Sequence, residues 1–195
     1  MSNDWKMPVE EASIGVVLTG GESKRMGRPK ALLPYKGTPL FYHLANTLQK
    51  VFNTVILSHR QDRFDIPITP WRVIEDAAES GGPLTGLLST LQAVNKPVFC
   101  MPCDTPFIDE ATIRHVLENR DKNQICTVLY NDENGFYEPL IGIWEISAIP
   151  VLQYNLSQGQ FSFQKILKEH HIRKIPPPDT SVLRNINTMA EWEAL

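Results

Sequence analysis

Residues 14–30 read IGVVLTGGESKRMGRPK, and this stretch decides the fold prediction. Ile14–Leu18 is short, apolar and rich in β-branched side chains, which indicates a buried strand. The strand runs into Gly20 and Gly21, where the backbone can turn with unusual dihedral angles and approach a ligand closely. The sequence therefore predicts a buried strand that ends in a glycine turn.

Polar and cationic side chains follow this turn closely. Successive N–H groups in such a turn can form a concave anion site; Ser23 adds a hydroxyl donor, and Arg25 and Lys30 add positive charge. The spacing matches neither G-x-G-x-x-G nor the Walker pattern, because Gly27 is followed by Arg28-Pro29-Lys30. We expect a phosphate site of another kind; the alternative is a plain glycine turn surrounded by solvated cations.

Further apolar runs alternate with helical patterns along the chain. Strands that alternate with helices imply an α/β fold, a Rossmann-like three-layer sandwich with a mostly parallel central sheet. The Asn134-Gly135 pair predicts a turn, and hence one antiparallel strand pair. Strands are expected at 14–18, 55–57, 72–75, 98–101, 125–130 and 137–144, and helices at 39–52, 83–94, 109–119, 147–156, 162–170 and after Thr188, with Pro39 at a first helical position.

Composition limits the class of protein. With 195 residues, 42% of them hydrophobic and 21% charged, the chain has the composition of one globular domain, which we place at 13–195 after a loose lead-in over 1–12. A net charge of −3 argues against nucleic acid and anionic membrane as partners. We find no apolar run of about 20 residues and no secretory signal, and three cysteines are too few for a disulfide framework, so we expect a cytoplasmic protein.

Acidic residues follow two of the expected strands. Asp104 comes after the strand at 98–101, and Asp76 directly follows the strand at 72–75. In parallel sheets ligands bind beyond the carboxyl ends of the strands, and Mg²⁺ often takes one or two carboxylates together with substrate phosphates. Asp104 is therefore a candidate Mg²⁺ ligand; from its position alone, a carboxylate that caps a turn is an equal alternative.

The glycine segment resembles the signature L-x-G-G-x-S-x-R-M-G-x-x-K of small nucleotidyltransferases, with Leu18 and Lys30 at its two ends. Three later segments resemble further motifs of the molybdenum cofactor guanylyltransferases, the MobA family: 73–76 with 82–86, 103–107 and 185–188. The match runs from about residue 14 to the C-terminus. The resemblance implies the α/β fold of the nucleotide-diphospho-sugar transferase type.

The resemblance also implies roles for individual residues. Arg25, Lys30 and Asp104 would be catalytic, with Asp104 on Mg²⁺. Nucleotide binding is implied for Leu18, Thr19, Gly20, Gly21, Ser23, Lys30, Ser58, Asp76, Gly82 and Asp104, and binding of the acceptor for Glu138, Pro139, Ser162, Asn185 and Asn187. Ser58 stands where the family often has Asn, and a serine lacks the paired donor and acceptor of an amide, so the choice of base stays open.

The activity that the resemblance implies is Mg²⁺-dependent transfer of GMP from GTP to the phosphate of molybdenum-bearing molybdopterin, with release of pyrophosphate. Transient contacts with molybdoenzymes or cofactor-insertion proteins would follow. Two alternatives stay open: a cytidylyltransferase or sugar-phosphate nucleotidyltransferase on the same fold, and a regulator that binds a nucleotide without turnover.

Overall fold

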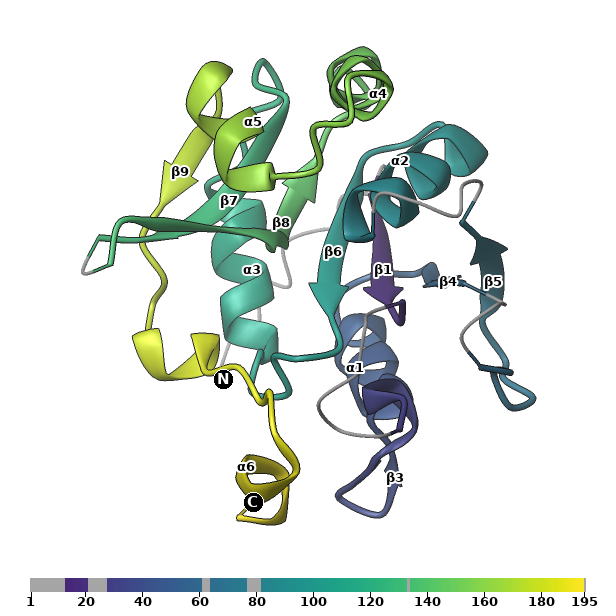
Figure 1. The fold of residues 1–195 in the computed structure, drawn as a ribbon. Helices are drawn as coiled ribbons and strands as arrows, with labels where there is room; N and C mark the ends of the chain where they lie inside the picture. Colours follow the sequence, from purple (N-terminus) through teal and green to yellow (C-terminus); the bar gives the residue numbers. More distant parts are fainter. Residues whose placement is uncertain (1–12, 21–27, 61–63, 77–81, 133, 195) are drawn as a thin grey trace, which may run out of the picture.

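The structure is a computed structural model, and it describes residues 13–20, 28–60, 64–76, 82–132 and 134–194. A seven-stranded sheet runs through this part of the chain in the order β5-β4-β1-β6-β8-β7-β9 (Figure 1). Its strands are β1 (Ile14–Leu18), β4 (Val55–His59), β5 (Arg72–Glu75), β6 (Val98–Pro102), β7 (Cys126–Asn131), β8 (Phe136–Trp144) and β9 (Arg173–Ile175).

The sheet is mostly parallel, as predicted. β1 pairs in parallel with β4 and β6, and β4 with β5, whereas β8 runs antiparallel to both β6 and β7. The predicted turn joins β7 to β8: Gly135 has a φ of +71° there, and its N–H donates to the carbonyl of Asn131. The antiparallel pair of the sequence prediction is therefore confirmed.

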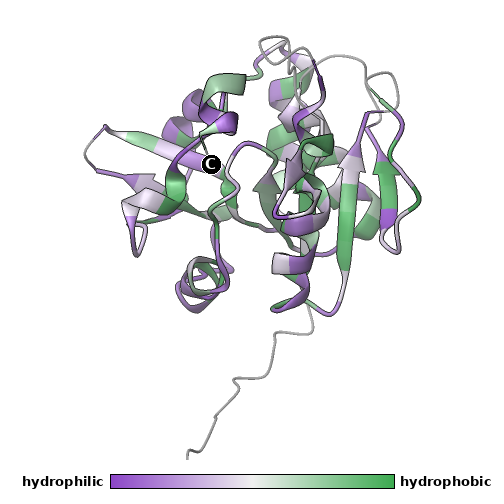
Figure 2. Ribbon diagram, turned by 90° about the horizontal axis from the view of Figure 1, so that it is seen from below, coloured by the Kyte–Doolittle hydropathy of each residue, from purple (hydrophilic) through white to green (hydrophobic). Residues whose placement is uncertain are grey.

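Helices cover both faces of the sheet, because successive strand residues point to opposite sides. Val17 belongs to a buried cluster with Leu44 and Ile113, which lie on helices on one face of the sheet, whereas Val16 belongs to a second cluster with Leu87 and Leu152 on the other face. Figure 2 shows the hydrophobic residues running along the central strands. The helices are α1 (Leu40–Gln49), α2 (Pro83–Val94), α3 (Glu110–Glu118), α4 (Ala148–Ser157), α5 (Phe163–Glu169) and α6 (Met189–Glu193).

Some local predictions need correction. Pro39 is not the first helical residue: it ends the short strand β3 (Thr38–Pro39) and stands at the N-cap of α1, which ends at Gln49 rather than at residue 52. The strand predicted at 55–57 continues to His59. The edge strand β9, the hairpin of β2 (Pro34–Tyr35) with β3, and the 3-10 helices η2 (Lys30–Leu32) and η3 (Thr180–Leu183) were not predicted.

Side chains cap two of these helices. The Asp109 side chain accepts a hydrogen bond from the N–H of Thr112 at the start of α3, and Thr188 forms a capping box with Glu191 at the start of α6. None of the helices among the described residues is long and apolar enough to cross a membrane.

The strand order creates one switch point. From β1 the chain moves to β4 and β5 on one side, and it then returns to place β6 on the other side of β1. Loops after β1 and β6 therefore lead away from each other, which opens a crevice at the carboxyl ends of these two strands. The glycine turn follows β1 and Asp104 follows β6, so the fold brings the two predicted segments to this crevice.

Candidate active site

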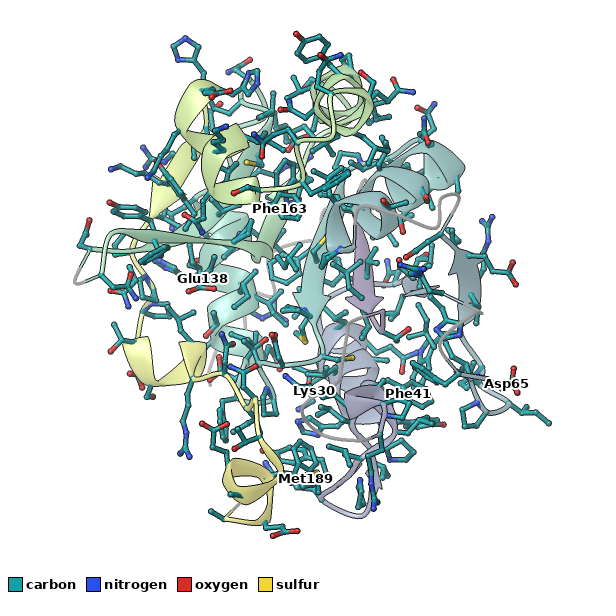
Figure 3. The ribbon with its side chains drawn as sticks, viewed as in Figure 1. Lys30, Phe41, Asp65, Glu138, Phe163 and Met189 are labelled. Carbon is teal, nitrogen blue, oxygen red and sulfur yellow. The ribbon has the colours of Figure 1, made fainter. Side chains whose placement is uncertain are left out.

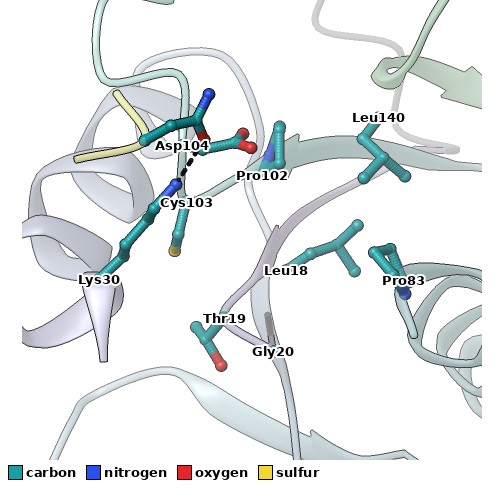
Figure 4. Close-up of a pocket in the computed structure, with 10 residues that line it drawn as sticks. Leu18, Thr19, Gly20, Lys30, Pro83, Pro102, Cys103, Asp104 and Leu140 are labelled. Atoms are coloured by element: carbon teal, nitrogen blue, oxygen red, sulfur yellow. Dashed lines mark hydrogen bonds between the residues drawn. The ribbon is translucent and has the colours of Figure 1, made fainter. Parts of the chain in front are cut away.

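A pocket with a volume of about 220 Å³ lies at this switch point. Residues after β1 form one wall and residues after β6 form another, while single residues from η2, α2, β8 and the C-terminal segment complete it (Figure 4). The lining residues are Leu18, Thr19, Gly20, Lys30, Pro83, Pro102, Cys103, Asp104, Leu140 and Asn187.

Among the described residues that line this pocket, Lys30 is the one with a positive charge. Its ammonium donates a hydrogen bond of 2.9 Å to the side-chain oxygen of Asn187, drawn as a dashed line in Figure 4. The positive charge of Lys30 also lowers the pKa of Asp104. Residues 30, 104 and 187, which are far apart in the sequence, therefore converge on one cavity.

The carboxyl group of Asp104 lies mostly buried at the end of β6. Burial raises its pKa above the usual value, and this effect outweighs the opposing charge of Lys30 and a backbone hydrogen bond. A buried carboxylate costs free energy unless a cation or hydrogen bonds compensate its charge. Asp104 is therefore arranged to gain from a further positive charge in the pocket.

The oxygen ligands in the pocket fit Mg²⁺. Mg²⁺ is usually held by one or two protein carboxylates plus substrate phosphates, not by a cage made only of protein groups. Asp104 supplies a carboxylate and Asn187 an amide oxygen at the same cavity, and the described residues include no cluster of three or more His, Cys, Asp or Glu that could hold a metal ion alone. This set of ligands suits a metal that arrives with a phosphate substrate.

A second polar group lies beside the pocket, between the ends of β4 and β5. The hydroxyl of Ser58 donates a 2.8 Å hydrogen bond to Asp76. Thr19 is held to the same strand end, because both its N–H and its hydroxyl donate to the carbonyl of Ser58 at 2.9 Å. The Ser58 side chain thus orients Asp76, and the Ser58 carbonyl fixes the first residue of the glycine turn.

Gly86 of α2 allows this close packing. A Cβ on Gly86 would lie 2.7 Å from the hydroxyl of Ser58 and 3.1 Å from Asp76. Because such contacts are too short, one of these side chains would have to move. A glycine here lets the first turns of α2 approach the Asp76 carboxylate, which also lies 3.7 Å from the point where a Cβ on Gly20 would be.

Glu138 lies at the same edge of the sheet because β8 runs antiparallel, so its first residues reach the level at which β6 ends. Glu138 and Lys30 are both labelled in Figure 3. Burial, together with a smaller effect of the negative charge of Asp104, raises the pKa of Glu138 to about 7. Glu138 does not line the pocket, but it is a second acidic group near Asp104, and its charge changes near neutral pH.

Replacing Glu138→Gln is expected to stabilise the protein at high pH. The pKa of Glu138 is raised in the folded state, so its destabilising effect is absent below the ordinary value of 4.5, grows as the pH rises, and is complete above about 7. Thermal unfolding with a chelator present should show a higher Tm for Glu138→Gln than for the wild type at pH 8, and no such gain at pH 4.

Glu169→Gln is the matched control, since Glu169 is exposed at the end of α5 and this change alters the net charge by the same amount. A Tm that does not differ between Glu138→Gln and the wild type at pH 8 would contradict the expected strain on the Glu138 carboxylate.

The structure places the other sequence-predicted residues as follows. Gly82 precedes α2 next to the pocket residue Pro83, with a φ of +56°. The Pro139 carbonyl accepts a hydrogen bond from the Trp144 indole, while Ser162 is the exposed N-cap of α5. Neither Pro139, Ser162 nor Asn185 lines the pocket. Gly21, Ser23 and Arg25, and the lead-in over 1–12, lie outside the described residues.

Several residues at the site were not predicted. Pro102 and Cys103 line the pocket directly before Asp104, and Arg60 packs 3.7 Å from the point where a Cβ on Gly20 would lie. The sequence could have indicated these residues, because each lies at or directly after the end of a parallel strand. Leu140 had no such signal, since it enters the pocket through the antiparallel direction of β8.

A doubly wound sheet with an acid, a lysine and a glycine at the end of β1 around a crevice at its switch point is typical of nucleotide-binding proteins. Comparison with known proteins gives the same class. Residues 15–174 match the family described as the MobA-like NTP transferase domain. The chain therefore belongs to this family and carries a nucleotidyltransferase domain.

Relatives agree with this assignment. The chain is 30% identical over 187 residues to a protein of Carboxydothermus hydrogenoformans named "Probable molybdenum cofactor guanylyltransferase", covering 92% of each chain. It is also 30% identical over 182 residues to the "Molybdenum cofactor biosynthesis bifunctional protein" of a Synechocystis strain, and this match covers 91% of the present chain but about half, 52%, of that longer protein.

The fold also matches a solved structure. The crystal structure of "Molybdopterin-guanine dinucleotide biosynthesis protein A" from Archaeoglobus fulgidus has a TM-score of 0.75 to this chain at 18% identity, and the match covers 93% of this chain and 95% of the other. At this identity the likeness supports the fold, which is the mostly parallel nucleotidyltransferase sandwich predicted from the sequence.

Proposed function

We propose that the protein transfers GMP from GTP to the terminal phosphate of molybdenum-bearing molybdopterin in a Mg²⁺-dependent reaction, forming the guanine dinucleotide cofactor. One observation carries this proposal: Lys30, Asp104 and Gly20 line the same pocket. The names of the relatives support the choice of acceptor and nucleotide.

In this reaction an oxygen of the acceptor phosphate attacks the α-phosphorus of GTP, the bond from that phosphorus to the bridging oxygen breaks, and pyrophosphate leaves with the electron pair. Phosphate is already ionised near neutral pH, so no protein base is needed. The work of the protein is alignment and compensation of charge, as in phosphoryl transfer generally.

Each pocket residue has a part in that alignment. The Lys30 ammonium binds triphosphate oxygens and stabilises the leaving pyrophosphate, and the turn at Gly20 carries the phosphate chain past the end of β1. Asp104, with the amide oxygen of Asn187, would hold Mg²⁺, which neutralises phosphate charge when it is bound. Glu138, whose pKa is affected by the nearby charge of Asp104, would contact the acceptor.

Asp76 is the proposed nucleotide-recognition group. A carboxylate can accept the two donors that guanine offers, N1–H and its amino group, or the hydroxyls of the ribose. Ser58 already donates to one oxygen of Asp76, so the carboxylate is held in one orientation at the end of β5. The choice of nucleotide is therefore the point at which this proposal is tested.

Pyrophosphate release should be fastest with GTP when the wild type is given molybdenum-bearing molybdopterin and each of GTP, CTP, ATP and UTP in turn. Reactions without the acceptor are the control for simple hydrolysis. Faster release with CTP would make the protein a cytidylyltransferase on the same fold. Binding of GTP without any pyrophosphate in the complete reaction would favour a nucleotide-binding regulator instead.

A further inference from the structure

The C-terminal segment before α6 is tied to both sides of the pocket. The N–H of Ile186 donates a 2.9 Å hydrogen bond to the carbonyl of Asp104, and the side-chain oxygen of the next residue, Asn187, accepts from Lys30 at 2.9 Å. Ile186 is buried, whereas Asn187 is exposed apart from this contact with the pocket. Packing therefore fixes residue 186 but leaves the position of Asn187 to its hydrogen bonds.

Glu191 supplies those hydrogen bonds on the other side of Asn187. One oxygen of its carboxylate, Oε2, accepts from the N–H of Asn187 at 2.7 Å and from the N–H of Thr188 at 2.9 Å. In a capping box the side chain of the glutamate accepts a bond only from the N–H of the N-cap residue, which is Thr188 here. The bond to Asn187 is additional, and it reaches outside the helix to a residue of the pocket.

The charge state of Glu191 agrees with this arrangement. Hydrogen bonds from the N–H groups of Asn187 and Thr188 lower the pKa of Glu191, with a smaller contribution from the charge of Arg184. The carboxylate is therefore ionised at neutral pH. It can act as an acceptor for both N–H groups over the whole range in which phosphate transfer is expected.

The helix that carries Glu191 contributes little to the core. α6 has five residues, and none of them is buried. A helix of this length is not stable by itself; it is anchored by the ring of Trp192, whose centroid lies 5.8 Å from that of Tyr35 in the β2–β3 hairpin. This hairpin directly follows η2, which begins with Lys30, so α6 is anchored to the element next to the one that supplies the pocket lysine.

We propose that Glu191 is a positioning residue of the active site: its carboxylate holds the backbone of Asn187, so that the Asn187 side chain stays in contact with Lys30 beside Asp104. The inference rests on the proposed function, because it assumes that Asn187 takes part in transfer. It adds a residue four positions beyond the pocket, on a helix that contributes no lining residue itself.

Three single variants separate positioning from capping. Glu191→Ala removes both bonds, and we expect kcat/KM for GTP to fall about tenfold, the loss expected for two hydrogen bonds of ordinary strength. Glu191→Gln should stay within about twofold of the wild type, because one amide oxygen can accept both N–H groups as Oε2 does. Thr188→Val removes the other half of the capping box and leaves both Glu191 bonds, so it should also stay near the wild type.

A double-mutant cycle gives the decisive measurement. If Glu191 acts through Asn187, Glu191→Ala should lower kcat/KM by less than about twofold in an Asn187→Ala background. Two results would overturn the inference. The first is an equal loss of activity in Thr188→Val and Glu191→Ala, which would mean that only the capping of the helix matters. The second is the same loss from Glu191→Ala in the wild-type and in the Asn187→Ala background.

A measurement that needs no activity separates this inference from the proposed function. In NMR spectra, Glu191→Ala should shift the backbone amide proton of Asn187 upfield and increase its exchange with solvent, while Glu191→Gln should not. An unchanged Asn187 amide in Glu191→Ala would reject the positioning role. Suppose instead that the amide of Asn187 shifts in Glu191→Ala while the wild type releases no pyrophosphate from GTP and acceptor. In that case the proposed function fails, but the contact between Glu191 and Asn187 stands.

Discussion

Replacing Asp104→Asn is expected to lower turnover by about 100-fold, the size of effect expected when a preorganised charge contact at the reacting groups is lost. The substitution keeps the shape of the side chain and removes its negative charge. Release of pyrophosphate from GTP and acceptor is the measurement. The Mg²⁺ concentration that gives half of the maximal rate should also rise in the variant, because a charged ligand is replaced by a neutral one.

Folding and function should respond in opposite ways to this change. Burial raises the pKa of Asp104, so the ionised carboxylate destabilises the folded protein at neutral pH when no metal is present. Thermal unfolding with a chelator should therefore give Asp104→Asn a Tm equal to or higher than that of the wild type. A loss of activity without a loss of stability would exclude simple misfolding.

Asp65→Asn provides the matched control. Asp65 is exposed and lies at the far edge of the molecule from the pocket (Figure 3), so this variant should keep wild-type turnover and the wild-type need for Mg²⁺. Near-normal pyrophosphate release from Asp104→Asn, at an unchanged Mg²⁺ requirement, would remove Asp104 from the proposed mechanism.

The architecture was predictable because its signals are local and strong. The strand at 14–18, the strand at 72–75 and the helix at 83–94 have the same bounds in the structure as in the prediction. The strand at 14–18 and the helix at 83–94 are largely apolar and are bordered by glycine, proline or polar residues. Two buried clusters on opposite faces follow directly, since alternating strand residues must point to different sides.

Elements that depend on distant partners were missed. The strand β9 has three residues, two of them exposed, and it exists through its pairing with β7. Such an edge strand has no periodicity of its own, so its sequence does not distinguish it from a loop. The hairpin of β2 and β3 was missed for a similar reason: it depends on a turn at Lys36 and Gly37, both with positive φ, and Lys36 is an unusual residue for that conformation.

The site was predictable in part. The ends of parallel strands pointed to Leu18 and Asp104, and both line the pocket. The hydrogen bond from Lys30 to Asn187 joins residues 157 positions apart, and only the fold can show it. The raised pKa of Glu138 likewise results from burial and from the neighbouring Asp104, which are properties of the packed structure rather than of the sequence around residue 138.

Replacing Lys30→Ala is expected to lower turnover by about 100-fold as well, because the ammonium is proposed to hold the triphosphate and to stabilise the leaving pyrophosphate. Lys96→Ala is the matched control: Lys96 is exposed in the loop that leads into β6, at the end of that strand away from the pocket. Pyrophosphate release should distinguish the two, with Lys96→Ala close to the wild type.

The loss of Lys30 should also be visible at Asp104. Lys30 lowers the pKa of Asp104, so in Lys30→Ala that pKa should be higher, and the carboxylate needed for Mg²⁺ should form only at higher pH. We expect the pH at which Asp104 is half ionised, followed by NMR of its carboxyl carbon, to move upward in Lys30→Ala and to stay unchanged in Lys96→Ala. An unchanged profile together with near-normal turnover would mean that Lys30 and Asp104 do not act on one bound metal and polyphosphate.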